Sequence, residues 1–369
     1  MTDATTLPLW IGTYPAPGAA PGSGEGIWYV AVDTADGSVR SERLATTLPS
    51  ASFLALHPSG RTLYAVSETS AGTLTAFRLE EPGPDGMPVP AVSGSVPTGG
   101  DDPCHVLARE GDAWVANYGD GVASSVAVDP ATGDLAAGSV ATHPGAGDGP
   151  VADRQAGPHA HFVADAGDHV LVADLGADVL RRYPAAGAAA GAEGEIAAVL
   201  PPGTGPRHLV ELPDGSLVVV GELDARVHVL SREGDGWAPA SSTPVCAGAD
   251  AGSDFAAHVT LSADGSRVHV GVRGSDVLAV HRVRYLDDGA PTLEHLADVP
   301  LGDGAWPRHH AVVRVGHGAD ETGAGTELVV VALQGRSELA GVRIDLATGA
   351  GEVVSRHRLP TPPACVLEA

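Results

Sequence analysis

A motif with a period of about 50 residues recurs along this chain and constrains its fold more than any other feature. Residues 205–222 show the motif most clearly: a short apolar run, a Pro-Asp-Gly turn, and a second apolar run that ends on a carboxylate. Aligned copies share one equivalent position, which is occupied by Phe53, His105, His161, His208, His258 and His309. Repeats of this length that carry several strands per unit are typical of β-propellers.

The two ends of the chain carry complementary fragments of one further unit. LPLWIGTY and GIWYVAVD near the N-terminus match the second and third strands of the repeat, and PACVLEA at residues 363–369 matches the first strand. Six whole units and this shared unit predict one all-β domain over residues 1–369. We expect a seven-bladed β-propeller of four-stranded antiparallel blades, with very little helix and with the ring closed by the C-terminal strand joining the N-terminal blade.

Three segments interrupt the repeat. The Pro-, Gly- and Ala-rich stretches 144–158 and 184–195 are predicted to be surface loops. The stretch GHGADETGAGTE, residues 316–327, is predicted to be an insertion between the first two strands of the last whole unit.

Charge and composition exclude several classes of function. The net charge of −25 argues against nucleic-acid and anionic-membrane partners, which require a basic face. All 21 basic residues are arginine, so neither a Schiff-base lysine nor a P-loop lysine is available. The N-terminus has no basic segment followed by an apolar core, and Cys104, Cys246 and Cys365 form no C-x-x-C motif. These features predict a cytoplasmic protein with reduced, mostly buried thiols and a minor possibility of a Cys104 nucleophile.

The candidate site residues are those that depart from the repeat where the inner strands meet at the channel mouth. The histidines at the repeated position are more simply structural, because their rings can bond backbone groups between blades. The departures are His159, Arg207, Glu222, Arg273 and Arg308. A buried charged group costs folding free energy unless it is paired with an opposite charge or serves a function, so these residues are the better candidates. His161, His208 and His309 lie on the inner strands, and Glu68 and Asp174 end second strands in other units.

The sequence resembles the seven-bladed lactonase family, which includes propeller-type 6-phosphogluconolactonases and the carboxy-cis,cis-muconate lactonising enzyme. The resemblance runs through IGTYPAPGAAPGSGEGIWYVAVD, FLALHPSGRTLYAVSE, HAHFVADAGDHVLVADLGADVL, GPRHLVELPDGSLVVVGE, VRGSD and the closing strand. Phe53 in place of histidine and the turn LAREGDAW depart from the pattern. The resemblance implies a site of one His (His159 or His161), Arg207, Arg273 and Glu222. We expect no cofactor and no metal, because the channel candidates are mostly His and Arg rather than oxygen ligands.

Lactone hydrolysis is the activity that the resemblance implies. Glu222 would activate water if burial raised its pKa, although neighbouring arginines would oppose that shift. Arg207 and Arg273 would hold an oxyanion, a phosphate or a carboxylate, and His159 or His161 would protonate the leaving oxygen. Arg308, His309, His208, Glu68 and Asp174 are expected to contact the substrate, a small lactone or organic acid bound by a monomer. Muconate-type cyclisation, a propeller that only binds a small ligand, and a divalent-cation site remain open alternatives.

Overall fold

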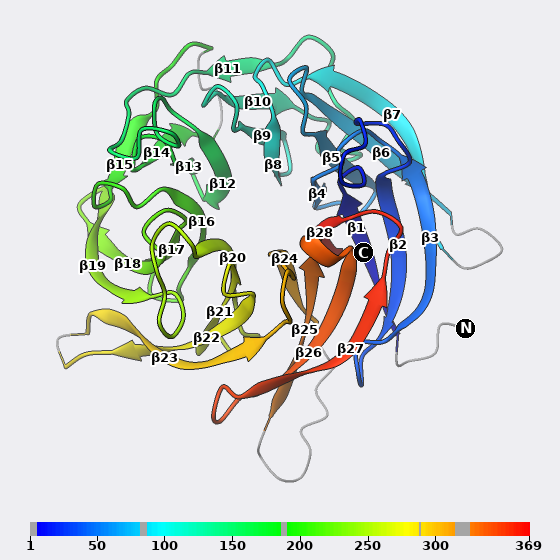
Figure 1. Ribbon diagram of the computed structural model, residues 1–369. Coiled ribbons are helices and arrows are strands. Elements are labelled where there is room, and N and C mark those ends of the chain that lie inside the picture. The colour runs from blue at the N-terminus through cyan, green and yellow to red at the C-terminus, as the bar shows by residue number, and fades with distance from the viewer. Residues whose placement is uncertain (1–5, 82–86, 186–189, 288, 314–324) are drawn as a thin grey trace.

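The protein forms a closed ring of seven four-stranded antiparallel sheets in the computed structural model, which describes residues 6–81, 87–185, 190–287, 289–313 and 325–369 (Figure 1). The prediction of a seven-bladed all-β propeller is confirmed. Within the described residues the helical content is one 3-10 turn, η1 (Gln334–Arg336). No helix in this part of the chain has the length and apolar character needed to cross a membrane.

Each blade runs from an inner strand at the channel to an outer strand at the rim. From inside to outside, the first four blades in chain order are β28 (Pro363–Glu368), β1 (Thr6–Thr13), β2 (Gly26–Asp33), β3 (Val39–Thr47); β4 (Phe53–Leu56), β5 (Thr62–Ser67), β6 (Thr73–Glu80), β7 (Val89–Pro97); β8 (Pro103–Ala108), β9 (Asp112–Asn117), β10 (Ala123–Ala127), β11 (Ala141–His143); β12 (Ala160–Ala166), β13 (His169–Asp174), β14 (Val179–Pro184), β15 (Glu195–Val199). The other three are β16 (Pro206–Glu211), β17 (Leu217–Gly221), β18 (Arg226–Glu233), β19 (Gly236–Pro244); β20 (Phe255–Leu261), β21 (Arg267–Arg273), β22 (Val277–Tyr285), β23 (Pro291–Pro300); β24 (Pro307–Val313), β25 (Thr326–Leu333), β26 (Glu338–Asp345), β27 (Gly351–Arg358).

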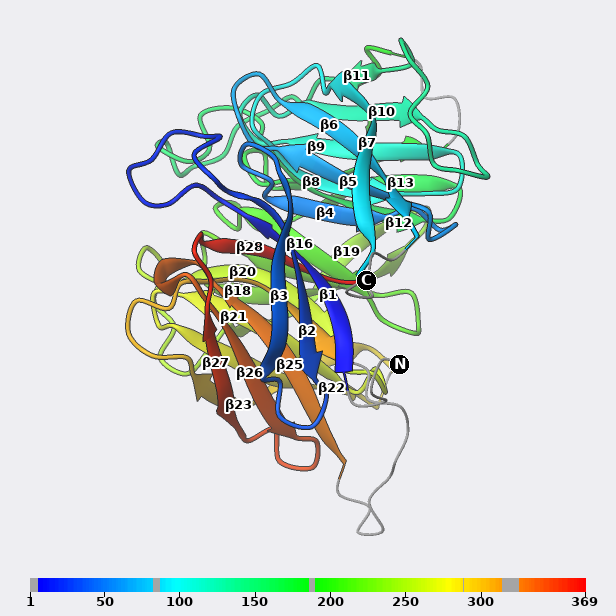
Figure 2. The same cartoon turned by 90° about the vertical axis from the view of Figure 1, so that its right-hand side faces the viewer.

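The predicted closure of the ring is also confirmed. β28 pairs antiparallel with β1, with Trp10 opposite Leu367 and Gly12 opposite Cys365. Figure 2 turns the ring so that the N-terminal blade faces the viewer and the label of the C-terminus lies beside this blade. The first and last strands of the described chain therefore belong to one sheet.

The hydrophobic core is distributed between neighbouring blades rather than gathered at one centre. One cluster joins Val218, Val220 and Val229 of one blade to Val268 and Val270 of the next, and every one of these side chains is buried. Because a second strand is packed against blades on both of its faces, its residues can be continuously apolar, as in β17, where all five residues are buried. In outer strands such as β19 most residues are instead half-buried or exposed, and Trp237 is the one buried residue of that strand.

Two of the expected loops lie partly outside the described residues. The insertion predicted at 316–327 falls mainly on residues 314–324, and the loop predicted at 184–195 includes 186–189. The loop predicted at 144–158 is described throughout, and it is not confined to the surface. Gln155 is fully buried, with its side-chain Nε2 donating to the Leu175 carbonyl at 2.9 Å and to Asp178 at 2.8 Å.

Candidate active site

One buried carboxylate holds three arginines at one end of the channel. Glu222 follows directly after β17 and is 2% exposed. Its Oε2 accepts a hydrogen bond from the guanidinium of Arg207, at the start of β16, and forms an ion pair at 3.0 Å with Arg273, at the end of β21. Its Oε1 accepts a hydrogen bond of 2.6 Å from Arg154. Three arginines and one glutamate leave this cluster with an excess of positive charge.

The prediction from sequence that Arg207, Glu222 and Arg273 lie together is therefore reproduced by the geometry. Arg154 is the residue that the sequence reasoning missed, because it lies in the loop 144–158 that was predicted to be superficial. Its isolation as the single cation of a Pro-, Gly- and Ala-rich loop, VADRQAG, is the signal that could have identified it. A single arginine in a loop whose other residues are small or acidic indicates an ion-pair partner outside that loop.

The environment of Glu222 does not raise its pKa. Burial alone would raise the pKa of this carboxyl, but Arg273 and Arg207, with further help from His161 and Arg154, hold it well below its usual range. The condition for Glu222 to act as a general base, a pKa raised towards neutrality, is therefore not met. A permanently charged carboxylate in this position orients guanidinium groups instead.

His161 is one of the titratable groups that are neutral in this site. It is 4% exposed, and burial lowers its pKa well below the ordinary value, with Arg207 acting in the same direction. Its ring lies 5.5 Å from that of Tyr118 and 5.3 Å from that of His208, measured between centroids. A neutral imidazole can accept a proton, whereas both oxygens of Glu222 are already bonded to guanidinium groups, so His161 is a candidate for the base.

The other predicted histidine, His159, has a different environment. Its ring stacks on Tyr118 with centroids 4.6 Å apart, and its Nδ1 lies 2.6 Å from the Tyr118 carbonyl oxygen, to which it donates. The Arg154 guanidinium donates to the hydroxyl of the same tyrosine at 3.3 Å. His159 thus supports Tyr118 and, through it, Arg154.

A small cavity of about 10 Å³ lies beside this cluster. We call this part of the channel the throat. Its wall is formed by Phe53, Cys104, His161, Arg207, His208, Arg308, His309 and Ala364. A space of this size holds one water molecule. Cys104 is an unsuitable nucleophile here, because burial raises the pKa of its thiol.

Arg308 also lines the throat. Its guanidinium carbon lies 4.7 Å from the centre of the Tyr14 ring, and its Nη2 lies 3.4 Å from Glu68. Tyr14 donates its hydroxyl hydrogen to the same carboxylate at 2.6 Å. Glu68 therefore lies near the site, as expected, but as the partner of Arg308. Asp174 is directed elsewhere: it accepts from Arg181 at 3.1 Å and from the His159 amide at 2.8 Å.

In and beside the throat, histidines line the channel and link neighbouring inner strands. We call His105, His161, His208, His258 and His309 the channel histidines. The ring of His105 accepts the Val163 amide hydrogen and that of His309 accepts the Val366 amide hydrogen, each at 3.2 Å, whereas His208 and His258 bond each other at 2.7 Å. These contacts agree with the expectation that the histidine at the repeated position links neighbouring blades. Among the described residues no three His, Cys, Asp or Glu side chains are grouped so that they could hold a metal ion.

The channel histidines predict a loss of stability in acid. Burial lowers the pKa of each, and that of His309 falls to about 3. Below about pH 6.5 these histidines are protonated in the unfolded chain but stay neutral in the folded ring, so the free energy of unfolding decreases as pH falls.

The variant His309→Gln tests this prediction, because glutamine keeps an acceptor for the Val366 amide but cannot titrate. We expect acidification from pH 7.5 to 5.5 to destabilise this variant less than the wild type, by about 1.4 kcal/mol in urea titrations. Equal losses in the two proteins would contradict the assignment.

Comparisons with known proteins agree with this architecture. The chain matches the family model "Lactonase, 7-bladed beta-propeller" over residues 8–367. It is 26% identical to the 6-phosphogluconolactonase of Bacillus subtilis over 309 residues, which cover 81% of this chain and 83% of that protein. A solved structure of the periplasmic gluconolactonase of Pseudomonas aeruginosa is 26% identical, covers 99% of both chains and superposes with a TM-score of 0.80. A solved structure from Bacteroides uniformis gives a TM-score of 0.81 at 25% identity, covering 99% of this chain and all of the other. The protein belongs to the lactonase family of seven-bladed β-propellers.

Proposed function

We propose that the protein is a lactone hydrolase of the 6-phosphogluconolactonase type, acting on a phosphorylated or carboxylated sugar lactone at the arginine-lined end of the channel. The observation that carries the proposal is the set of Arg154, Arg207 and Arg273 held around Glu222. In a chain of net charge −25, this local excess of positive charge is suited to an anionic substrate. The relatives named 6-phosphogluconolactonase and gluconolactonase support the same reaction class.

The proposed mechanism assigns the proton transfers to His161. Its neutral ring takes a proton from a water in the throat, and the oxygen of that water forms a bond to the lactone carbonyl carbon. Arg207 and Arg273 stabilise the negative charge that develops on the carbonyl oxygen. The bond to the ring oxygen then breaks, and the His161 imidazolium returns the proton to the leaving alkoxide, so that the base is regenerated. Glu222 stays ionised throughout and keeps the two guanidinium groups in place.

The test of this function is a panel of δ- and γ-lactones measured with and without a phosphate group, corrected for spontaneous hydrolysis. We expect the phosphorylated lactones to have the higher kcat/KM, because a charge-assisted hydrogen bond contributes about 1.5–3 kcal/mol, or roughly 10–100-fold. Arg154→Gln should raise KM for the phosphorylated substrates while leaving neutral lactones nearly unaffected. Arg284→Gln, at the exposed end of β22, is the control for general loss of charge.

Two results would contradict the proposal. Equal efficiency on neutral and phosphorylated lactones would remove the role assigned to the arginines. Full activity of His161→Gln would remove the assigned base.

A further inference from the structure

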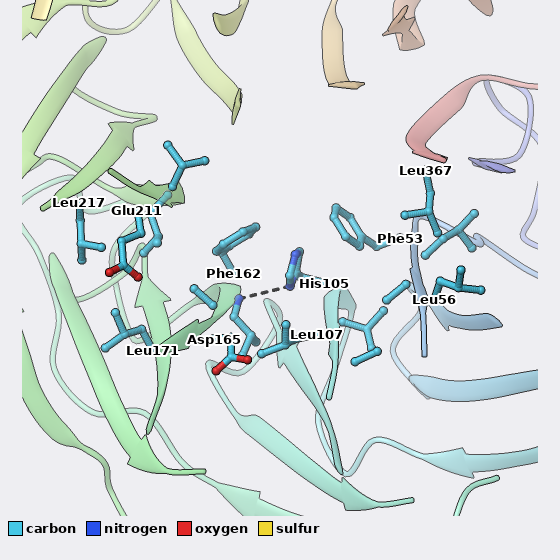
Figure 3. A pocket seen from close by; sticks show the side chains of 18 residues that line it. Phe53, Leu56, His105, Leu107, Phe162, Asp165, Leu171, Glu211, Leu217 and Leu367 are labelled. Atoms are coloured by element: carbon cyan, nitrogen blue, oxygen red, sulfur yellow. Dashed lines mark hydrogen bonds between the residues drawn. The ribbon is translucent and has the colours of Figure 1, made fainter. Parts of the chain in front are cut away.

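A larger pocket of the protein lies away from the arginine cluster. It has a volume of about 450 Å³ and is bordered by the inner strands β4, β8, β12 and β16 together with Leu367 of β28 (Figure 3). On β8, β12 and β16 the throat residues Cys104, His161 and Arg207 come first, and the pocket residues follow them along the strand. The pocket therefore opens at the other end of the channel.

The channel-facing residues of this pocket are apolar and partly exposed. Its walls include Leu56, Leu107, Ala164, Val210 and Leu367, each of which retains access to solvent in spite of its position on an inner strand. Concave apolar surfaces of 300–1,000 Å³ are typical of small-molecule sites. A space of this size accommodates a ligand of roughly 10–20 non-hydrogen atoms.

Aromatic rings form the inner end of the pocket. Phe53 and Phe162 lie on either side of His105, with ring centroids 4.2 and 4.1 Å from that of the histidine. Figure 3 shows the three rings next to one another at the back of the pocket. Burial lowers the pKa of His105 well below its ordinary value, so this wall carries no positive charge at neutral pH. Uncharged aromatic faces attract organic cations.

The only charged side chains that line the pocket within the described residues are carboxylates, Asp165 and Glu211. Asp165 lies 3.5 Å from Arg109, but this arginine also pairs with Asp112 at 3.4 Å. The Glu211 carboxylate has no hydrogen-bond or ion-pair partner among the described residues and is exposed. Within this part of the chain Asp112 and Asp165 thus share one guanidinium and Glu211 has none, so the opening of the pocket has a net negative charge.

We propose that this pocket is a second binding site, for a small hydrophobic molecule that carries a single positive charge, such as an alkyl or aryl ammonium compound. The apolar walls bind its hydrocarbon part, the aromatic end and the two carboxylates select its charge, and a hydrophobic anion is rejected. The site is separate from the lactonase site and opposite to it in charge, so the two ends of one channel take ligands of opposite sign.

Calorimetric titration with three probes of similar size tests the proposal: benzyldimethylhexylammonium, 4-hexylbenzyl alcohol and 4-hexylbenzoate. We expect the cation to bind with a submillimolar Kd, the alcohol at least tenfold more weakly, and the anion most weakly. Glu211→Gln, an exposed substitution, should weaken binding of the cation about 3- to 10-fold and leave the alcohol unchanged. The matched control is Glu352→Gln, whose side chain is 72% exposed on the outer strand β27.

A second variant tests whether the probes bind in this pocket. Ala164→Phe fills the space between the walls and should abolish binding of both the cation and the alcohol. Arg154→Gln, at the other end of the channel, should leave both Kd values unchanged, so a failure of the lactonase proposal would not affect this result. The proposal would be overturned if the three probes bound with equal affinity or if the cation did not bind at millimolar concentration. It would also be overturned if the Glu211→Gln or Ala164→Phe variant bound the cation as tightly as the wild type does.

Discussion

Replacing Glu222 by glutamine is expected to destabilise the protein by about 3–5 kcal/mol and to lower kcat/KM by about 10²–10³ per folded molecule. Glutamine keeps the size of the side chain but leaves the buried guanidinium groups of Arg207 and Arg273 without a counter-charge. The loss of activity follows because the same guanidinium groups then lack the carboxylate that orients them. Melting temperature, urea unfolding and turnover are measured on the same preparation.

The matched control is Glu294→Gln. Glu294 also lies within 4 Å of two arginines, Arg282 and Arg284, but its side chain is 45% exposed. Exposed ion pairs contribute about 0–1 kcal/mol, so this variant should unfold nearly as the wild type does. The comparison separates the effect of burial from the effect of removing a carboxylate.

The double variant Glu222→Gln, Arg273→Gln decides between two roles of the carboxylate. If Glu222 neutralises and orients the arginines, removing one of them should recover part of the lost stability but none of the activity. A Glu222→Gln protein of unchanged stability that is nevertheless inactive would instead restore Glu222 as the general base. An unstable variant with full activity per folded molecule would make the carboxylate purely structural.

Removal of residues 363–369 is expected to leave no stably folded protein. The deletion takes β28 away from β1 and exposes Trp10 and Ile11, which are fully buried in the intact ring. It also removes the buried Cys365 and Val366. Each large apolar side chain exposed costs about 1.5–3 kcal/mol, so the total is comparable with the 5–15 kcal/mol that stabilises a typical domain.

Circular dichroism and thermal melting check this expectation, and Val366→Ala is the graded control. This substitution should cost only one or two methyl groups of burial, about 1–3 kcal/mol, and keep a cooperative transition. A truncated protein that melts at the wild-type temperature would show that closure of the ring contributes nothing to its stability.

The fold could be predicted from sequence because each unit repeats the same local pattern. An apolar run, a turn and a second apolar run identify a strand pair wherever they occur, and the fragments at the two ends identified the pairing of β28 with β1. The order of the strands in every blade followed from that pattern. Repetition supplied the information that a single occurrence of such a pattern would not.

The site could be predicted only in part. Arg207, Glu222 and Arg273 were identified because they interrupt apolar strands, whereas Arg154 comes from a loop whose path depends on the buried contacts of Gln155. The pKa direction of Glu222 was also beyond the sequence, since burial and neighbouring arginines act in opposite directions and their distances decide which effect is larger. The apolar pocket left no motif, because its residues are ordinary members of inner strands.

The pairing of β28 with β1 has a consequence for biosynthesis. At translation rates of about 5–20 residues per second, β28 emerges from the ribosome roughly 20–70 s after β1, because about 350 residues separate them. During that interval the edge of β1 that later pairs with β28 lacks its partner, and unpaired edges are where chains join one another wrongly. We therefore expect a nascent chain of this protein to be most prone to wrong pairing before its C-terminal strand arrives, so that conditions that slow translation increase its aggregation.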